Sequence, residues 1–335
     1  MKTKNRPSGL KYSVLVTGSE GFIGSHICDE LLRKGYFVFG MDNYSKYGPV
    51  EREHVSHKNF QLIKRDVIDL DEHVVIEPDY IIACAAMIGG ISYFHKYAYD
   101  LLATNERITA STFDWAIKKW QEGTLKRIIV MSSSMVFENT DVYPTPEEEV
   151  FKCPPPFSTY GFQKLATEYF AQGALEQYEL PFTIVRPFNA VGLGEEDFKE
   201  GTSHVIPDLI FKALNSKPDE PLEILGNGDQ VRCYTHVKDI ARGTVMAMES
   251  DNAINNDYNI SAPQALSVKA LATMIWRKIH GTYPVFKSTP PFMYDVQKRI
   301  PDTSKAKEDL GFETSMSLSS GIDEIIEEMR KHVNV

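Results

Sequence analysis

Short apolar runs alternate with amphipathic stretches over roughly the first 190 residues. The apolar runs predict strands at 12–17, 36–41, 60–64, 80–84, 127–131 and 182–186. Apolar residues at helical spacing predict helices over 22–34, 100–120 and 160–177. Strands joined through helices imply crossover connections and a parallel sheet that is covered on both faces. The pattern therefore predicts an α/β fold with a doubly wound parallel sheet.

The pattern changes after residue 190. Two turn-rich stretches and an irregular segment follow, at 192–201, 226–229 and 284–301. Shorter helices are predicted near 205–213 and 268–278. We expect residues 1–190 to form the sheet domain and residues 191–335 to form mainly a smaller domain over its carboxyl edge. A segment near 232–262 is expected to return to the first domain.

The overall composition narrows the functional classes. With 42% hydrophobic and 24% charged residues, the chain is typical of a soluble globular protein. A net charge of −10 argues against general nucleic-acid binding, which needs a basic surface. No apolar run approaches the ~20 residues that span a bilayer, and the basic, polar N-terminus is unlike a secretory signal. We therefore expect a cytoplasmic protein that binds neither membrane nor nucleic acid.

The potential metal ligands do not form a recognisable site. The four cysteines, Cys28, Cys84, Cys153 and Cys233, are far apart in the sequence and include no CxxC pair. The nine histidines also lack metal-ligand spacing. We expect buried free thiols and no metal.

A glycine-rich turn follows the first predicted strand. Gly18, Gly21 and Gly24 have the spacing GxxGxxG between a strand and a helix. The first glycine permits the tight turn, the second lets a pyrophosphate approach the backbone, and the third lets helix and strand pack closely. Asp42 ends the second strand, where a carboxylate accepts hydrogen bonds from ribose hydroxyls and repels a 2′-phosphate. These features predict a dinucleotide site that prefers NAD to NADP.

A second motif supplies groups for proton transfer. Tyr160 and Lys164 are four residues apart and share a helical face. A tyrosine has a pKa of about 10, and a nearby ammonium favours its phenolate. Residues 132–134 are serines at the carboxyl end of a predicted strand, where doubly wound sheets bind ligands. A phenol that can lose its proton beside a hydride-accepting dinucleotide indicates an oxidoreductase centre.

The chain resembles an extended short-chain dehydrogenase/reductase of the NAD-dependent nucleotide-sugar epimerase/dehydratase branch, over nearly its whole length. The motifs that occur in family order are Gly18-x-x-Gly21-x-x-Gly24, Asp66-Val67, Ala83-x-Ala85-Ala86, Ser132-Ser133, Tyr160-x-x-x-Lys164 and Arg186-Pro187-Phe188-Asn189. The second half adds Gly226-x-Gly228-x-Gln230-x-Arg232-x-Tyr234-x-His236-Val237-x-Asp239 and then Arg299-x-x-Asp302. The resemblance implies a Rossmann-type domain with a smaller C-terminal substrate-binding domain.

The resemblance also implies roles for individual residues. It assigns catalysis to Ser133, Tyr160 and Lys164. Residues expected at the NAD, besides Tyr160 and Lys164, are Gly18, Gly21, Phe22, Ile23, Gly24, Asp42, Asn43, Asp66, Val67, Ala83, Ala85, Ala86, Asn105 and Pro187. Residues expected at a UDP- or GDP-linked sugar are Met87, Gly89, Ser133, Ser134, Asn189, His204, Val205, Arg232, Arg299 and Asp302. Planar guanidinium groups suit phosphate oxygens, so Arg232 and Arg299 are expected at the diphosphate.

The serine segment favours one reaction of this branch. Ser134 and Met135 stand where related 4,6-dehydratases carry Asp-Glu, and neither side chain is a competent acid or base. Related uronic-acid decarboxylases carry Glu at the position of Met135, and related 3,5-epimerases carry Cys there. We therefore expect C4 epimerisation of a UDP-hexose or related sugar through a 4-keto intermediate with retained NAD. A non-catalytic, cofactor-sensing regulator is expected to lack Tyr160 or Lys164.

Two alternatives stay open at this point. A glycine-rich segment, 87–91, resembles the sugar loop of the 3,5-epimerases, and Lys199 would be a second acid for that reaction. A C4 dehydrogenase that releases a keto sugar needs the same three catalytic residues. His204 stands where many relatives have asparagine, which leaves the sugar undetermined. Relatives pair through two helices, here near 98–120 and 160–177, so we expect a homodimer.

Overall fold

The computed structural model describes residues 9–10, 12–50, 52–71, 73–90, 93, 96–195, 204–290 and 296–333. Seven parallel strands form its main sheet, in the order β11-β6-β5-β4-β1-β2-β3. The bounds are β1 Ser13–Thr17, β2 Phe37–Asp42, β3 Phe60–Lys64, β4 Tyr80–Ala83, β5 Arg127–Met131, β6 Phe182–Pro187 and β11 Asn256–Ile260. The order reverses between β1 and β4, which creates the crevice where doubly wound sheets bind ligands.

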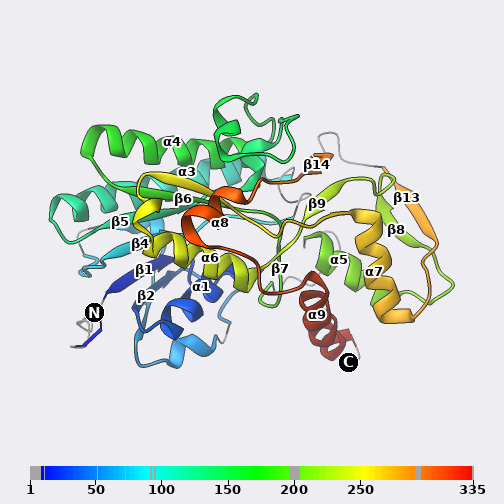
Figure 1. The fold of residues 1–335 in the computed structure, drawn as a ribbon. Coiled ribbons are helices and arrows are strands. Elements are labelled where there is room, and N and C mark those ends of the chain that lie inside the picture. The colour runs from blue at the N-terminus through cyan, green and yellow to red at the C-terminus, as the bar shows by residue number, and fades with distance from the viewer. Residues whose placement is uncertain are drawn as a thin grey trace.

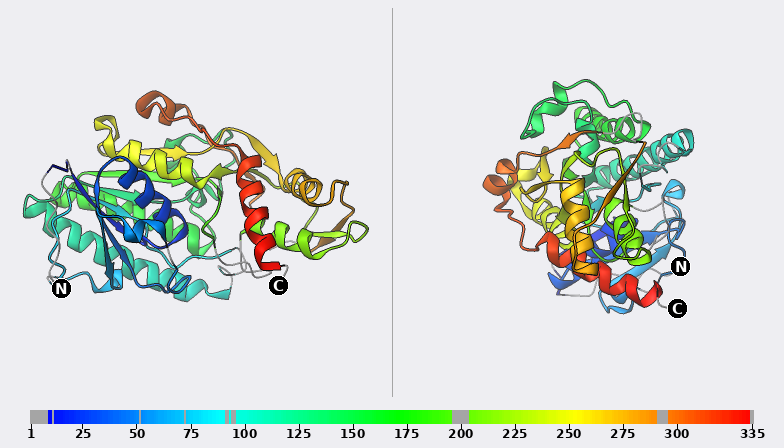
Figure 2. Two further views of the ribbon diagram at one scale, coloured as in Figure 1. Left: turned by 90° about the horizontal axis from the view of Figure 1, so that it is seen from below. Right: turned by 90° about the vertical axis from the view of Figure 1, so that its right-hand side faces the viewer.

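Helices cover both faces of this sheet (Figures 1 and 2). On one face lie α3 (Ala98–Gln121) and α4 (Thr159–Tyr178), and on the other lie α1 (Phe22–Arg33) and α6 (Val237–Glu249). Neighbouring residues of β1 belong to different hydrophobic cores, because successive side chains of a strand point to opposite faces of the sheet. Leu15 packs into the α3–α4 layer with Trp115, whereas Val14 packs into the α1–α6 layer with Ile27.

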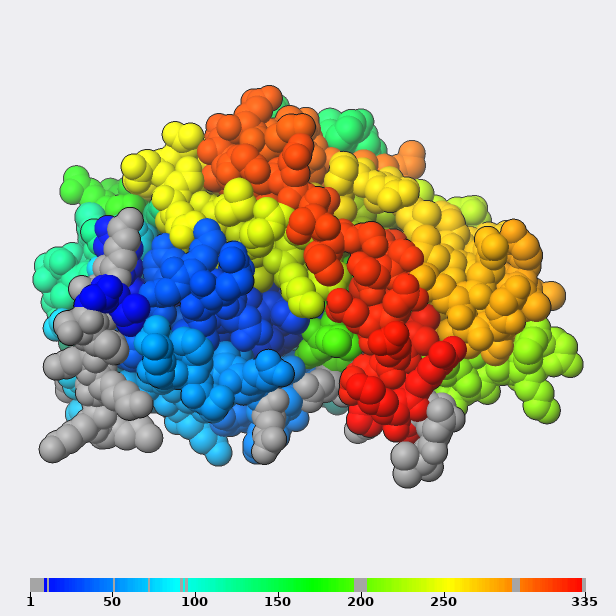
Figure 3. Space-filling model, turned by 60° about the horizontal axis from the view of Figure 1, so that its bottom comes forward, coloured from blue at the N-terminus to red at the C-terminus, as the bar shows by residue number. Residues whose placement is uncertain are grey.

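A second group of elements packs beyond the carboxyl edge of the sheet, on the right in Figure 1. Its helices are α5 (Val205–Asn215), α7 (Val268–His280) and α9 (Leu318–Val333), and they share a core that contains Trp276 and Ile325. Its strands are β7 Ala190–Val191, β8 Leu222–Leu225, β9 Val231–Cys233, β10 Thr235–His236, β12 Ala265–Ser267, β13 Phe286–Thr289 and β14 Lys298–Arg299. In the space-filling view, α9 (red) lies between this group and the blue N-terminal elements (Figure 3).

The α/β architecture predicted from the sequence is confirmed, and the predicted strands and helices of the first 190 residues differ from the observed ones by one or two residues at their ends. The segment 284–301 was predicted to be irregular, which is wrong, since it contains β13 and β14. After α6 the chain adds β11 to the main sheet beside β6. The division into a cofactor domain and a substrate domain stays a prediction. No described helix is both long and apolar enough to cross a bilayer.

A buried ionic network joins β5, β6 and β11 at the β11 end of the sheet. Arg186 on β6 is 1% exposed and donates two hydrogen bonds, of 2.8 and 2.7 Å, to the carboxylate of Glu168 on α4. Its third guanidinium nitrogen lies 2.7 Å from Asp257 on β11, which also accepts a 2.6 Å hydrogen bond from Lys305. Ser132, at the end of β5, donates to Glu168 over 2.5 Å. The network therefore connects β5, β6, β11, α4 and α8 (Ser304–Leu310).

We expect Arg186→Met to destabilise the fold strongly. The substitution leaves the buried carboxylate of Glu168 without its cation and leaves Asp257 with Lys305 alone, which costs about 3–5 kcal/mol of unfolding free energy. Chemical denaturation measures this loss. The matched control is Arg33→Met, because Arg33 pairs with Glu30 on the surface with a 66% exposed side chain, and exposed pairs contribute little. Equal unfolding free energies for the two variants would contradict the structural role given to Arg186.

Candidate active site

A cavity of about 970 Å³ opens at the carboxyl ends of β1, β2, β4, β5 and β6. Most residues that the sequence analysis assigned to cofactor or substrate line it. They are Gly18, Gly21, Phe22, Ile23, Gly24, Asp42, Asn43, Asp66, Val67, Ala85, Ala86, Met87, Gly89, Ser133, Ser134, Tyr160, Lys164, Pro187, Asn189, His204, Val205, Arg232 and Arg299. The structure thus brings them around one space, and their ligand contacts stay predictions.

The glycine turn places the N-terminus of α1 against the cavity. A Cβ at Gly24 would lie 2.0 Å from the carbonyl oxygen of Gly18, and Gly18 itself has φ +70°. Only glycine fits both positions without moving the backbone. The N-cap residue Gly21 provides no side-chain cap, and the first turn of α1 carries no acidic residue. The positive end of this helix therefore faces the cavity, which fits the pyrophosphate of a dinucleotide.

Asp42 ties the glycine turn to the end of β2. Its carboxylate accepts a 3.0 Å hydrogen bond from the backbone N–H of Glu20 and a 2.7 Å bond from that of Tyr44. Burial raises the pKa of Asp42, while these two hydrogen bonds oppose the rise. A carboxylate held here at the edge of the cavity fits the ribose hydroxyls of NAD and disfavours a 2′-phosphate.

The sequence analysis did not predict the roles of His54 and Arg52 beside the glycine turn. His54 lies between two carboxylates, 3.2 Å from Glu20 and 3.2 Å from Asp29. Arg52 donates to the backbone carbonyls of Glu20 and Gly194, over 3.2 and 3.3 Å. Arg52 thereby links the cofactor turn to the segment that follows β7. These contacts join residues far apart in the sequence, so no local pattern indicates them.

Ser133 and Tyr160 meet beside the end of β5. The Ser133 hydroxyl lies close enough to the Tyr160 phenol to lower its pKa. Ser158 caps α4 by accepting a 3.0 Å hydrogen bond from the N–H of Gly161, which fixes Tyr160 in the first turn. Tyr160 is 7% exposed, and its burial raises its pKa, whereas the Ser133 hydroxyl and the charge of Arg299 act in the opposite direction.

Lys164 is buried and lines the same cavity as Tyr160. Its ammonium donates a 3.0 Å hydrogen bond to the carbonyl oxygen of Met131, and burial lowers its pKa to about 8. The positive charge of Arg299 lowers the pKa of the Tyr160 phenol. The expectation that Lys164 also favours the phenolate stays a prediction. Arg299, on β14, lines the same cavity, a tertiary arrangement that helical spacing does not reveal.

Two arginines occupy paired positions on neighbouring strands. Arg232 on β9 and Arg299 on β14 are direct partners in a parallel pair, and both line the cavity. Arg299 also donates to the side chain of Asn189 over 3.4 Å. Like charges in directly paired positions destabilise a sheet, and an anion bound between them removes that repulsion. The arrangement fits a diphosphate, whose oxygens pair with guanidinium groups.

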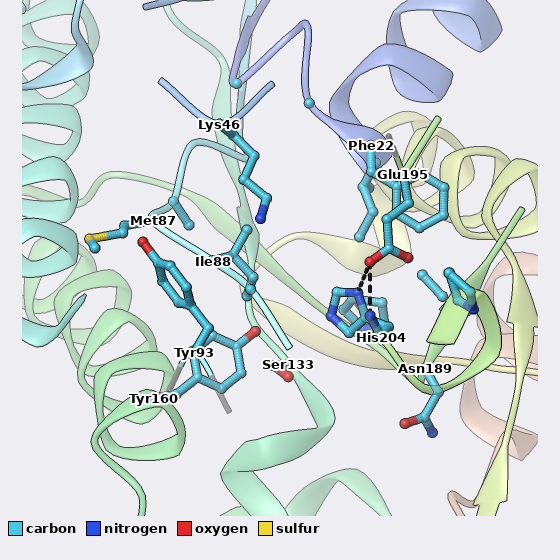
Figure 4. Close-up of a pocket in the computed structure, with 18 of the residues that line it drawn as sticks. Phe22, Lys46, Met87, Ile88, Tyr93, Ser133, Tyr160, Asn189, Glu195 and His204 are labelled. Atoms are coloured by element: carbon cyan, nitrogen blue, oxygen red, sulfur yellow. Dashed lines mark hydrogen bonds and ion pairs between the residues drawn. The ribbon is translucent and has the colours of Figure 1, made fainter. Parts of the chain in front are cut away.

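His204 and Glu195 form an ionic pair across the cavity from Tyr160 (Figure 4). The imidazole Nδ1 lies 2.5 Å from Glu195, and the side chain of His204 is 47% exposed, whereas that of Glu195 is 8% exposed. Burial would lower the pKa of His204, but the adjacent carboxylate outweighs it and raises the pKa. Glu195 was not predicted. The two residues are nine positions apart in the sequence, and the structure brings their side chains together.

Three residues predicted at the ligands do not line this cavity, and their ligand contacts stay predictions. Asn105 does not line the cavity, because its amide forms hydrogen bonds of 2.7 and 3.0 Å with both backbone groups of Met87. It holds the loop after β4 in place. Asp302 instead accepts hydrogen bonds from the backbone N–H and hydroxyl of Ser304 at the start of α8. Ala83 lies within β4, outside the cavity lining. Lys199 lies outside the described residues.

Metal ligation finds no support in the described part of the chain. Among those residues, no three histidine, cysteine, aspartate or glutamate side chains gather closely enough to hold an ion. The four cysteines are free thiols, and burial raises the pKa of Cys84 to about 12. Such thiols are poor nucleophiles at neutral pH.

Comparison with known proteins agrees with this geometry. Residues 14–261 match the model of the NAD dependent epimerase/dehydratase family. UDP-glucuronic acid decarboxylase 1 of Xenopus tropicalis is 28% identical over 96% of this chain and 72% of its own length. The structure of UDP-glucose 4-epimerase from Thermotoga maritima with UDP-glucose has a TM-score of 0.81 and 31% identity, over 96% of this chain and 99% of that one. UDP-glucuronic acid 4-epimerase from Bacillus cereus, with UDP-glucuronic acid and NAD, has a TM-score of 0.80 and 26% identity over the same shares.

We expect Arg232→Met to weaken the binding of free UDP and free GDP by about 10- to 100-fold, since each charged hydrogen bond contributes about 1.5–3 kcal/mol. Isothermal titration calorimetry measures the dissociation constants. Arg277→Met is the matched control, because Arg277 on α7 contacts Tyr283 and lies outside the cavity. Unchanged nucleotide affinity in the Arg232 variant would exclude this strand pair as the diphosphate site.

Proposed function

Because the chain belongs to the NAD dependent epimerase/dehydratase family, we propose that it is a nucleotide-sugar C4-epimerase. The substrate is a UDP-linked hexose or related sugar, and the reaction passes through a 4-keto intermediate with retained NAD. The observation that carries this proposal is that Ser133 and Tyr160 line one cavity at the end of β5, close enough for Ser133 to lower the pKa of the phenol. The two residues that follow Ser133, Ser134 and Met135, supply no acid or base for another step.

The mechanism needs one proton acceptor and one holder of the reacting oxygen. When bound, NAD, the cofactor of this enzyme, takes up a hydride from the sugar carbon and later returns it. Tyr160, as phenolate, removes the proton of the 4-hydroxyl, and Ser133 holds that oxygen by a hydrogen bond. The charge of Arg299 favours the phenolate, in opposition to burial. If the 4-keto sugar rotates in the site before the hydride returns, the hydride reaches the opposite face of C4. Tyr160 then returns the proton to the 4-oxygen, which gives the C4 epimer.

Two further observations support epimerisation over decarboxylation. The similar structures from Thermotoga maritima and Bacillus cereus are those of a UDP-glucose 4-epimerase and a UDP-glucuronic acid 4-epimerase. The Xenopus relative is a decarboxylase, but the related decarboxylases carry Glu at the position of Met135. Met135 lines the cavity here with a thioether, which neither donates nor accepts a catalytic proton.

A second candidate function is a 3,5-epimerase or C4 dehydrogenase that acts on a GDP- or UDP-sugar. The observation that favours the 3,5-epimerase is the Glu195–His204 pair. An imidazole held by a carboxylate on the far wall can exchange a proton with the carbon next to a ketone. It would take the role that the sequence analysis gave to Lys199. Met135, where the related 3,5-epimerases have cysteine, leaves the opposite face without a partner acid, so C4 epimerisation remains our first proposal.

Proton NMR of the purified protein with UDP- and GDP-sugars, without added NAD, tests the proposal. We expect a C4 epimer to appear, because retained cofactor completes the cycle. A released keto sugar would indicate the dehydrogenase, and solvent deuterium at C3 or C5 would indicate the 3,5-epimerase. Tyr160→Phe is expected to lower kcat by about 10²- to 10⁴-fold, the usual contribution of a positioned acid or base. Tyr283→Phe is the control, since Tyr283 is 71% exposed and lies outside the cavity lining.

We also propose that the chain forms a homodimer through α3 and α4. The two helices pack together, and their outer surface carries aromatic side chains that a monomer leaves in water. These are Tyr99 at 77%, Phe162 at 49%, Tyr169 at 67% and Phe170 at 36% exposure. Phe113 and Trp115, on the same pair of helices, belong to the core.

Sedimentation velocity is expected to give twice the chain mass of 37.9 kDa. Tyr169→Glu should shift the protein towards the monomer, because it places a charge inside the apolar contact. Tyr283→Glu, on an aromatic side chain of similar exposure far from these helices, should leave the mass unchanged. A wild-type protein that sediments as a monomer at micromolar concentration would exclude the dimer.

A further inference from the structure

We propose that the sugar of this enzyme carries an apolar substituent on C5, a methyl group, and is therefore a 6-deoxy sugar. The inference rests on the proposed C4 chemistry, since it takes Ser133 and Tyr160 as the position of the 4-oxygen. It adds a substrate class that the catalytic residues alone leave open. The sugars named for the similar 4-epimerase structures carry a hydroxymethyl group or a carboxylate at this carbon.

The first observation is an apolar wall around the phenol of Tyr160. Tyr160 packs in one cluster with Leu101, Met135 and Val296. Ile88 and Tyr93 pack against that cluster, and both lie beside Tyr160 on the same side of the cavity (Figure 4). A group bonded to the carbon next to C4 on this side therefore meets aliphatic carbon, sulfur and an aromatic ring.

The second observation concerns charge. Between residues 84 and 108 and between residues 131 and 135, every described residue that lines the cavity is uncharged. The charged lining comes from other segments, with Glu195 and His204 on the opposite wall and the arginine pair at the diphosphate position. Lys46 acts electrostatically on Glu195 and His204. The segments 84–108 and 131–135 thus contribute no charged lining residue, although Lys164 also lines the cavity and Lys46 lies 5.6 Å from the centre of the Tyr93 ring.

The third observation is the close packing of the wall. A Cβ at Gly89 would lie 2.5 Å from the ring of Tyr93, so only glycine permits this position of the ring. Tyr93 also packs on Tyr97, with ring centroids 4.7 Å apart. The aromatic surface is therefore held in place by its neighbours, and it offers a preformed contact for a methyl group.

These observations select among the groups that C5 can carry. Of the two carbons next to C4, C5 bears the exocyclic carbon. A carboxylate placed against Met135 and Ile88 would lose its hydration, and neither of these side chains offers a charge or a hydrogen-bond donor in return, which is costly. A hydroxyl would lose a hydrogen bond at a lower cost. A methyl group loses neither and gains apolar contact.

The test compares three UDP-sugars that share configuration and differ only at C6: UDP-6-deoxyglucose, UDP-glucose and UDP-glucuronate. Calorimetry on the holoenzyme gives their dissociation constants. We expect the 6-deoxy sugar to bind about 10- to 100-fold more tightly than UDP-glucose, the usual discrimination of an apolar pocket against an added hydroxyl. UDP-glucuronate should bind more weakly still. A parallel series compares the same three groups, methyl, hydroxymethyl and carboxylate, on C5 of a GDP-mannose.

Variants at Met135 and Ile88 test whether the preference for the 6-deoxy sugar comes from this wall. Met135→Gln is expected to reduce the preference for the 6-deoxy sugar at least tenfold, because it introduces an amide where the methyl group contacts sulfur. Met135→Leu is the matched control and should keep the preference. Ile88→Thr gives a second polar substitution on the same wall and should act in the same direction.

Equal or reversed affinities in both series would overturn the inference. Tight binding of the uronate that is lost in Lys46→Met would also overturn it and would assign a carboxylate subsite to Lys46. The outcomes separate this inference from the proposed function. A 6-deoxy preference without formation of a C4 epimer would refute only the epimerase, and epimerisation with no preference at C6 would refute only the substrate class.

Discussion

The position of the catalytic groups depends on the buried guanidinium of Arg186. It lies between the carboxylates of Glu168 and Asp257, and Glu168 also accepts from Ser132. Burying three charges is costly unless they are paired with good geometry. Here the pairing joins the end of β5, which continues into Ser133, to α4, which carries Tyr160 and Lys164. One ionic group thus holds the two catalytic elements together and adds β11 to the sheet beside them.

The cavity that results has two unlike sides. The wall beside Tyr160 carries an apolar cluster that includes Met135 and Ile88, and the opposite wall carries His204 and Glu195. At one end, paired arginines on β9 and β14 offer adjacent positive charge. At the other, the open N-terminus of α1 faces the cofactor position. Such a space fits an elongated, doubly charged ligand with one hydroxylated and one apolar face, alongside a dinucleotide.

Arg52 connects the cofactor side of the cavity to the side that carries Glu195 and His204. It bonds the carbonyl oxygens of Glu20, in the glycine turn, and Gly194, next to Glu195. Asn105 acts in a similar way on the other side, because it holds both backbone groups of Met87 in the loop after β4. Neither residue needs to touch a ligand for its contacts to shape the cavity.

The sequence by itself determined the local part of this protein. Hydrophobic periodicity predicts six of the seven strands of the main sheet and its helices up to α4, because side-chain direction repeats with the backbone. Glycine spacing and the Tyr160–Lys164 interval predict the cofactor turn and the proton-transfer helix, because both are properties of a few consecutive residues. The tertiary structure alone decided which distant groups meet. It placed β11 beside β6, Arg299 in the same cavity as Tyr160, Glu195 against His204, and Asn105 against the backbone of Met87. These contacts come from tertiary packing, and their energies depend on burial and pairing that no local pattern encodes.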